Sequence, residues 1–211
     1  MAQNPSATAP SAPIRDRILA SARALVLDRG FASTTVDAVL AEAGASKGAF
    51  FHHFPSKGAL GRAIVDAYVR DDAAFLDDLL ERAAAATEDP GEQLVWFVRQ
   101  LEALADAPLD EQPACLMVSF IYENQLGEAG IGGVVRGSIR YWRERIRERL
   151  EAAARTRPHL QDEDLGAMAD HVFVTIEGAF LLARAMDDGT ALRRQLGQLR
   201  RYLEVLLDGP P

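Results

Sequence analysis

The sequence predicts an all-α protein with an N-terminal three-helix domain that contains a helix-turn-helix, followed by a larger helical C-terminal domain. Three observations lead to this prediction. Apolar residues recur at three-to-four-residue spacing, capping residues or glycine and proline separate these segments, and no segment shows the alternation of a half-buried strand. We expect a disordered tail over residues 1–13, the helix-turn-helix domain over 14–62 and the second domain over 63–211.

The composition excludes several classes of protein. With 48% hydrophobic and 26% charged residues, the chain of 211 residues is typical of a globular protein rather than a fibrous or disordered one. Its one cysteine cannot form an intramolecular disulfide and favours a reducing compartment. No stretch approaches the ~20 uninterrupted apolar residues of a membrane helix, so we expect a cytoplasmic protein without a membrane partner.

The first predicted helix covers about residues 14–28. Its apolar stripe runs through Ile14, Ile18, Ala22 and Leu25 at helical spacing. Gly30 follows as the stop, because a left-handed residue after a helix is easiest for glycine.

Capping residues predict the next three helices. Thr34 and Asp37 form a variant of the capping box, so we expect the second helix to begin near Thr34 and to end at Ala43–Gly44. Ser46 is a good N-cap for a short helix over 47–53. Pro55 then breaks the chain, and Ser56 caps a fourth helix over 57–86.

Residues 33–54 therefore outline a helix, a tight turn and a second, short helix. The crossing of the helices and the turn need small residues, which are supplied by Ala38, Ala41, Ala43 and Gly44. In a DNA-binding unit of this kind, the second helix enters the major groove with its N-terminal residues near the base edges.

Charge is distributed unevenly along the chain. The net charge is −8, yet residues 1–62 hold seven Lys and Arg against four Asp and Glu. The helix-turn-helix segment is therefore mildly basic and the remainder strongly acidic, which is compatible with an anionic partner for the first segment only.

Residues 14–68 resemble the N-terminal domain of the tetracycline-repressor (TetR/AcrR) family. The resemblance is carried by Gly-Phe-Ala-Ser-Thr-Thr-Val at 30–36 and by Ala-Glu-Ala-Gly-Ala-Ser-Lys-Gly-Ala-Phe-Phe-His-His-Phe-Pro-Ser-Lys at 41–57. It covers about a quarter of the chain, and beyond it only the helical layout is similar. The resemblance implies a homodimer that binds a palindromic operator in double-stranded DNA and responds to a small-molecule effector.

The resemblance also implies which residues contact DNA. The nine candidate DNA contacts are Thr34, Thr35, Ser46, Lys47, Gly48, Phe51, His52, His53 and Lys57. The threonines and Lys57 would bind phosphate, and the others would open the recognition helix or face the groove. Two positions depart from the pattern, because Phe51 stands where the family usually has Tyr and Ala49 where it often has Thr. We expect these departures to weaken DNA anchoring or to alter the operator.

The second domain is expected to hold helices near 91–106, 113–126, 133–155, 163–186 and 190–207. Residues 169–186 are apolar on more than one face, and the last helix carries a leucine stripe at Leu192, Leu196, Leu199, Leu203, Leu206 and Leu207. We interpret the last two helices as half of a four-helix bundle across a dimer axis. The alternative is an ordinary core helix pair within one chain.

Candidate effector residues are bulky or polar groups within otherwise apolar helices. They are Trp96, Met117, Phe120, Tyr122, Asn124, Trp142, His171, Phe173 and Thr175. Aromatic walls with a few polar groups are typical of small-molecule sites and favour an apolar or aromatic effector. For each residue taken singly, core packing is the alternative.

The functional hypothesis is a DNA-binding transcriptional regulator, most simply a repressor released from its operator by an effector. Ligand-independent regulation, activation, and a helical protein-interaction module that has lost DNA binding remain open. No nucleophile–base triad, Gly-x-Ser-x-Gly or His-Glu-x-x-His motif is present, so we expect no enzyme, cofactor or metal site.

Overall fold

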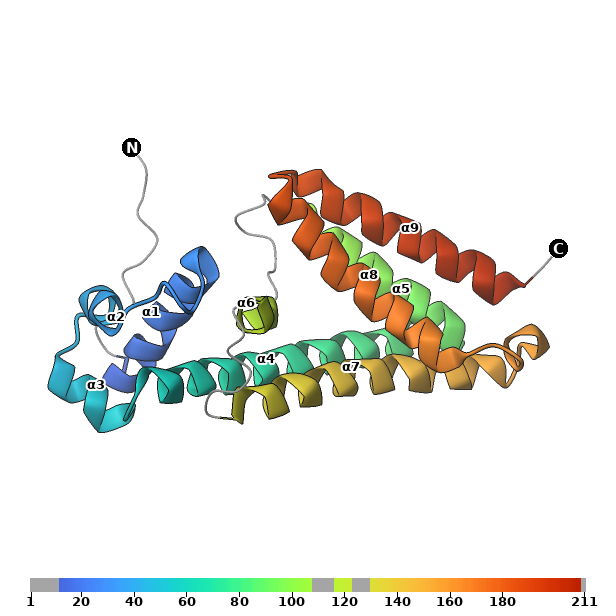
Figure 1. Ribbon diagram of the computed structural model, residues 1–211. Coiled ribbons are helices and arrows are strands. Elements are labelled where there is room, and N and C mark those ends of the chain that lie inside the picture. The colour runs from blue at the N-terminus through green and yellow to red at the C-terminus, as the bar shows by residue number, and fades with distance from the viewer. Residues whose placement is uncertain (1–11, 108–115, 123–129, 210–211) are drawn as a thin grey trace. The chain divides into compact units, whose positions relative to one another are not determined.

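The computed structural model describes residues 12–107, 116–122 and 130–209, and their regular structure is helical throughout (Figure 1). The prediction of an all-α fold is confirmed. Most of the predicted tail over 1–13 lies outside the described residues. The helices are α1 Ile14–Arg29, α2 Val36–Ala43, α3 Lys47–His53, α4 Lys57–Ala86, α5 Pro90–Leu104, α6 Leu116–Tyr122, α7 Ile131–Ala154, α8 Leu165–Ala185 and α9 Gly189–Asp208.

The start of α2 corrects one prediction. Thr35, not Thr34, is the N-cap, and its side chain accepts a hydrogen bond from the backbone N–H of Ala38 at 3.2 Å. Thr34 is only 3% exposed, and its hydroxyl donates to the carbonyl of Gly30 at 2.7 Å. The capping box of Thr34 and Asp37 is wrong because the Thr34 side chain points into the core of the fold.

The chain divides into two compact units. The first comprises residues 1–70 and 116–136, and the second comprises residues 71–115 and 137–211. The predicted boundary between residues 62 and 63 falls inside α4, whose residues are shared between the units, as are those of α7. The sequence did not predict that residues 116–136 belong with the N-terminal segment.

Aromatic packing explains the place of α6 in the first unit. The rings of Phe120 in α6 and Phe31 lie 4.9 Å apart, and both side chains are buried. Gly61 of α4 makes this contact possible, because a Cβ there would lie 2.6 Å from the Phe31 ring. The remaining core of this unit includes Ile18, Ala22, Val26, Val39, Phe50, Phe54, Leu60 and Ile64.

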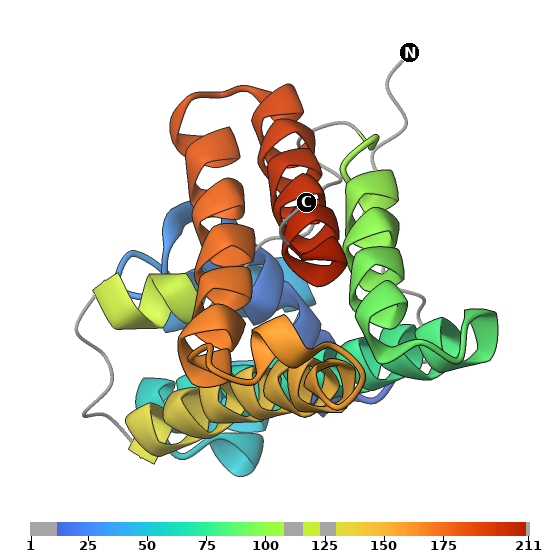
Figure 2. The same ribbon diagram turned by 90° about the vertical axis from the view of Figure 1, so that its right-hand side faces the viewer.

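In the second unit, α9 packs against both α5 and α8, as the two views show (Figures 1 and 2). The leucine stripe of α9 faces this core. Its buried members are Leu192, Leu196, Leu199, Leu203 and Leu207, and Leu206 packs against them partly buried. For the stripe itself the alternative of a core helix pair holds, because these side chains are covered by their own chain.

Polar contacts join α4 to α7 within the second unit. Tyr141 Oη donates to Asp77 at 2.6 Å, and Arg145 Nε donates to the same carboxylate at 3.1 Å. Trp142 Nε1 donates to Asp72 at 2.6 Å. These bonds set the register in which the two helices lie side by side.

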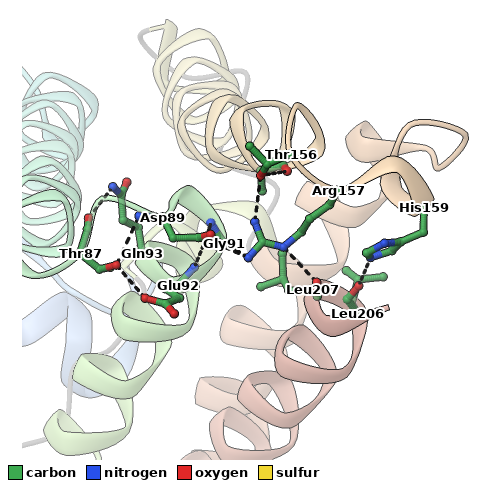
Figure 3. Close-up of polar contacts among 11 residues, drawn as sticks. Thr87, Asp89, Gly91, Glu92, Gln93, Thr156, Arg157, His159, Leu206 and Leu207 are labelled. Carbon is green, nitrogen blue, oxygen red and sulfur yellow. Dashed lines mark hydrogen bonds and ion pairs between the residues drawn. The ribbon is translucent and has the colours of Figure 1, made fainter. Parts of the chain in front are cut away.

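A clasp around Arg157 holds the start of α5 and the end of α9 (Figure 3). Arg157 Nη2 donates to both carboxylate oxygens of Asp89 at 2.9 Å, and Arg157 Nε donates to the carbonyl of Leu207 at 2.9 Å. His159 Nε2 lies 3.0 Å from the carbonyl of Leu206. Burial alone would raise the pKa of Asp89, but the hydrogen bonds from Arg157 and from the start of α5 lower it.

Within the described residues, α8 is long and apolar enough to cross a membrane by length and composition. Core helices of globular proteins share this property. In this structure α8 packs along α9, and the apolar side chains on its other side are exposed.

Candidate nucleic-acid interface

The turn between α2 and α3 has the geometry that a helix-turn-helix requires. Gly44 adopts a left-handed conformation with φ of 58°. The N–H of Ala45 then returns to the carbonyl of Leu40 at 3.0 Å, which closes the end of α2. Ser46 follows immediately as the N-cap of α3, and its hydroxyl accepts from the N–H of Ala49 at 3.1 Å.

Helix α3 has one buried and one exposed side. Phe50 is fully buried, and Phe54 just after the helix is buried as well, so both anchor α3 to the core. The exposed side presents Ser46, Lys47, Gly48, Phe51 and His52. The structure thus places these five predicted DNA-contacting residues on one surface.

The exposed side chains of α3 are largely free of internal contacts. Lys47 forms no hydrogen bond or ion pair with any other described residue. Phe51 is 48% exposed and meets only the edge of Phe50, with ring centroids 5.2 Å apart. The rings of His52 and the half-buried His53 lie 4.9 Å apart. A surface with one unpaired cation and one exposed aromatic ring fits contacts to a nucleic acid.

Gly48 is not required by the packing of the protein. A Cβ at this position would meet only the Ser46 hydroxyl oxygen, at 3.9 Å. Glycine within a helix costs about 0.5–1 kcal/mol relative to alanine. The packing of the described residues therefore leaves room for a side chain at this position.

Two residues of the predicted DNA-contacting set have internal roles instead. The hydroxyl of Thr34 is buried and already donates within the fold. The Lys57 ammonium donates to the carbonyl of Ala32 at 3.0 Å and lies 4.7 Å from the centre of the Phe31 ring. The Lys57 side chain thus supports the turn that leads into α2, whereas Thr35 remains exposed at the start of that helix.

Sequence reasoning missed Arg17. From α1, its guanidinium donates to the carbonyl of Ala43 from Nε at 3.2 Å and from Nη2 at 2.8 Å. Nη2 also donates to the carbonyl of Gly44 at 2.9 Å. These bonds satisfy the last carbonyls of α2 and fix the turn that orients α3. No local pattern could have found this role, because the partners lie 26 and 27 residues away.

We expect the variant Arg17→Ala to unfold more easily by about 2 kcal/mol, because it removes charge-assisted hydrogen bonds to otherwise unsatisfied carbonyls. DNA binding should weaken with it, because α3 loses its fixed orientation. Thermal unfolding and fluorescence anisotropy measure the two effects. Arg29→Ala is the matched control, since Arg29 is exposed at the end of α1 and forms no hydrogen bond or ion pair with any other described residue. Equal stability of the two variants would contradict the role of Arg17.

The predicted effector residues do not share one surface. Met117 and Phe120 are buried in the first unit, whereas the rest of the described candidates belong to the second. The side chain of Tyr122 and the whole of Asn124 lie outside the described residues. In the second unit these candidates are Trp96, Trp142, His171, Phe173 and Thr175.

Trp142 is the centre of an aromatic cluster in the second unit. Its ring lies 6.2 Å from that of Phe97 and 6.3 Å from that of Phe173. Burial raises the pKa of Asp72, against the lowering effect of hydrogen bonds from Trp142 and Ser138. Sequence reasoning missed Asp72, a partly buried carboxylate among aromatic rings.

Two other candidates lie away from this cluster. His171 is exposed on α8 and stacks edge-on against Tyr202 of α9, with ring centroids 4.9 Å apart. Trp96 lines a separate groove beside α9.

Helices α2 and α3, joined by the tight turn at Gly44, have the geometry of a helix-turn-helix, the class of domain that many DNA-binding proteins carry. Comparison with known sequences supports this class, because residues 18–64 match the family described as bacterial regulatory proteins, tetR family. Residues 18–64 thus match the N-terminal domain of a family of transcriptional regulators. The resemblance found in the sequence is thereby confirmed.

Individual relatives agree with the family assignment. The chain is 27% identical over 157 residues to the transcriptional regulator AcuR of Cereibacter sphaeroides. The aligned segment covers 74% of this chain and 70% of AcuR. This chain is also 28% identical over 111 residues to the transcriptional repressor DhaR of a Mycobacterium species. That alignment covers 53% of this chain and 52% of DhaR. A TetR-family regulator from Agrobacterium tumefaciens superposes with a TM-score of 0.73 at 25% identity, over 90% of this chain and 96% of that one.

Proposed function

We propose that the protein is a homodimeric, cytoplasmic repressor that binds a palindromic operator and is released from it by a small-molecule effector. The observation that carries the DNA-binding part is the exposed side of α3, with an unpaired Lys47 and a glycine that the fold does not need. The name of DhaR, a transcriptional repressor, supports the sign of regulation.

The proposed DNA contacts are made by seven of the nine residues that the sequence predicted. Helix α3 and its N-cap contact base edges and phosphates through Ser46, Lys47, Gly48, Phe51, His52 and His53. The start of α2 adds a contact from Thr35. Thr34 is assigned to supporting this surface from behind, because its hydroxyl donates within the fold. Lys57 is assigned to the same role because its ammonium donates to the carbonyl of Ala32, which uses one of its three N–H donors. Phosphate contacts fix the register of the protein on the duplex, and contacts to base edges supply the sequence preference.

The dimer is proposed to form through the outer sides of α8 and α9. The chain leaves large apolar side chains exposed at Val174 and Leu181 of α8, at Met186 just after α8, and at Val205 of α9. Gly178 lies between Val174 and Leu181, and a Cβ there would meet nothing within 4 Å, so a second helix can approach closely. A symmetric pair is what a palindromic operator needs, with half-sites about 34–36 Å apart.

The effector is proposed to be apolar or aromatic and to bind in the second unit beside Trp142 and Phe173, with Asp72 as the polar group. An aromatic wall with one buried carboxylate recognises a ligand that carries a hydrogen-bond donor. Release from DNA requires that the effector bind the DNA-free state more tightly than the DNA-bound state.

The test is fluorescence anisotropy of the purified protein with the DNA that flanks its own gene. Titrations at two salt concentrations, with a scrambled duplex as competitor, separate specific from non-specific binding. We expect tighter binding to the flanking DNA and a loss of affinity with salt, because neutralised phosphates release counterions. Binding to both duplexes alike and without salt dependence would favour the interaction-module alternative.

We expect Lys47→Ala to weaken operator binding by about tenfold or more and to flatten the salt dependence by about one phosphate contact. The dimer should persist, since Lys47 lies in the first unit, away from α8 and α9 in the sequence. Analytical ultracentrifugation and the same anisotropy assay check both statements. Unchanged affinity would remove Lys47 from the interface.

A further inference from the structure

A groove in the second unit is not used by the proposed function. It has a volume of about 460 Å³, within the usual range of ligand sites, and lies between the end of α4, α5 and the end of α9. The residues that carry the argument are Thr87, Glu92, Trp96, Arg99, Leu207 and Asp208.

One edge of the groove is held in place by hydrogen bonds (Figure 3). Thr87 Oγ1 donates to Glu92 at 2.7 Å, and Gln93 Nε2 donates to the carbonyl of Thr87 at 2.9 Å. On the side of α9, the carbonyl of Leu207 accepts from Arg157. The walls are therefore preorganised, which lowers the entropic cost of binding.

Arg99 is the cation with unused donors in this groove. Its nearest carboxylate oxygen, on Glu204, lies 3.8 Å from Nη2, and that same oxygen accepts from Arg200 at 2.8 Å. The Arg99 side chain is 60% exposed. A guanidinium with free N–H groups is suited to bidentate binding of a carboxylate.

An aromatic surface lies next to this cation. Trp96 precedes Arg99 by three residues on α5, so the two side chains are neighbours along the helix. Leu207 adds aliphatic surface to the same groove. The Arg82 guanidinium lies over one face of the Trp96 ring, 5.6 Å from its centre, so a planar ligand ring would stack on the other face while its acid group reaches Arg99.

The remaining lining groups limit the ligand to one anionic group. Glu92, Glu204 and Asp208 are carboxylates, which repel a second anion and accept a hydrogen bond from a ligand donor. We infer that the groove binds an aromatic carboxylate with a hydroxyl or amino group at the far end of its ring. Arg99 holds the carboxylate and Trp96 stacks on the ring.

This groove is distinct from the aromatic cluster of the proposed effector site. Trp96 and Phe97 are consecutive in α5, so their side chains point about 100° apart around the helix. Phe97 contacts Trp142, whereas Trp96 lines the groove. The inference therefore does not depend on the proposed repressor function.

Calorimetric titration of the full chain with 4-hydroxybenzoate tests the inference. We expect saturable binding that Arg99→Gln weakens by about tenfold or more, because a charge-assisted bond contributes roughly 1.5–3 kcal/mol. The uncharged analogue 4-hydroxybenzamide should bind the unmodified chain as weakly as 4-hydroxybenzoate binds the Arg99→Gln variant. Arg201→Gln is the matched control: Arg201 is exposed on α9 outside the groove, and its loss should change affinity less than about twofold.

Nuclear magnetic resonance of the indole N–H groups locates the probe, since the chain has two tryptophans. We expect the Trp96 signal, assigned with Trp96→Phe, to shift on titration while that of Trp142 stays in place. No saturable binding at millimolar probe, equal affinity of the two arginine variants, or a shift of the Trp142 signal alone would each overturn the inference. The last outcome would place the probe in the proposed effector site.

Discussion

The variant Gly48→Ala is expected to be more stable than the natural chain and yet a weaker DNA binder. The added methyl group has open space in the free protein and removes the entropic cost of a helical glycine, so the free energy of unfolding should rise by about 0.5–1 kcal/mol. Operator affinity should fall by about tenfold or more, because the methyl group occupies the space into which the DNA backbone or a base edge must come. Thermal unfolding and anisotropy measure these opposite effects.

Gly137→Ala is the control for this prediction. Gly137 is an exposed glycine in α7 of the second unit, and a Cβ there would meet nothing within 4 Å. It should give the same gain in stability with unchanged DNA affinity. If Gly48→Ala bound the operator as well as Gly137→Ala does, α3 could not approach DNA through Gly48, and the proposed interface would have to move.

The second large effect is expected from Leu181→Asp. Leu181 is 48% exposed on the apolar side of α8, where the second chain is proposed to pack. A carboxylate buried there without a partner costs several kcal/mol, so the dimer dissociation constant should rise by about a hundredfold or more. Sedimentation equilibrium should show monomers, and operator binding should weaken because one chain holds only one half-site.

Leu104→Asp is the matched control for the dimer variant. Leu104 at the end of α5 is 40% exposed and receives the same substitution, but it is not on α8 or α9. Its variant should remain dimeric. Monomers of both variants, or dimers of both, would show that the outer side of α8 is not the interface.

Much of the fold could be predicted from local patterns. The bounds of α3 and α4 agree with the prediction, and α5, α7, α8 and α9 begin and end within two residues of it. Both ends of the helix predicted over 113–126 lie outside the described residues. The agreement arises because helical periodicity and capping act over three to four residues, a range that the sequence displays directly. α2 is the exception, because two adjacent threonines offered equivalent caps and only the burial of Thr34 selects Thr35.

The candidate site could be predicted in part. The exposed side of α3 follows from the matched family pattern, and the structure places Lys47 and Gly48 on it. The roles of Arg17, Lys57 and Asp72 could not be predicted, because their partners come from other helices or turns.

The sequence by itself determined the all-α class, the helix-turn-helix and the family, since each depends on residues that are near one another in the chain. Only the tertiary structure decided which side of an apolar helix its own chain covers. The leucine stripe of α9 is buried against α5 and α8, and Val174 and Leu181 of α8 remain exposed. Periodicity shows that a helix has an apolar side, but the free energy of burial does not depend on whether the covering surface belongs to the same chain or to a second one.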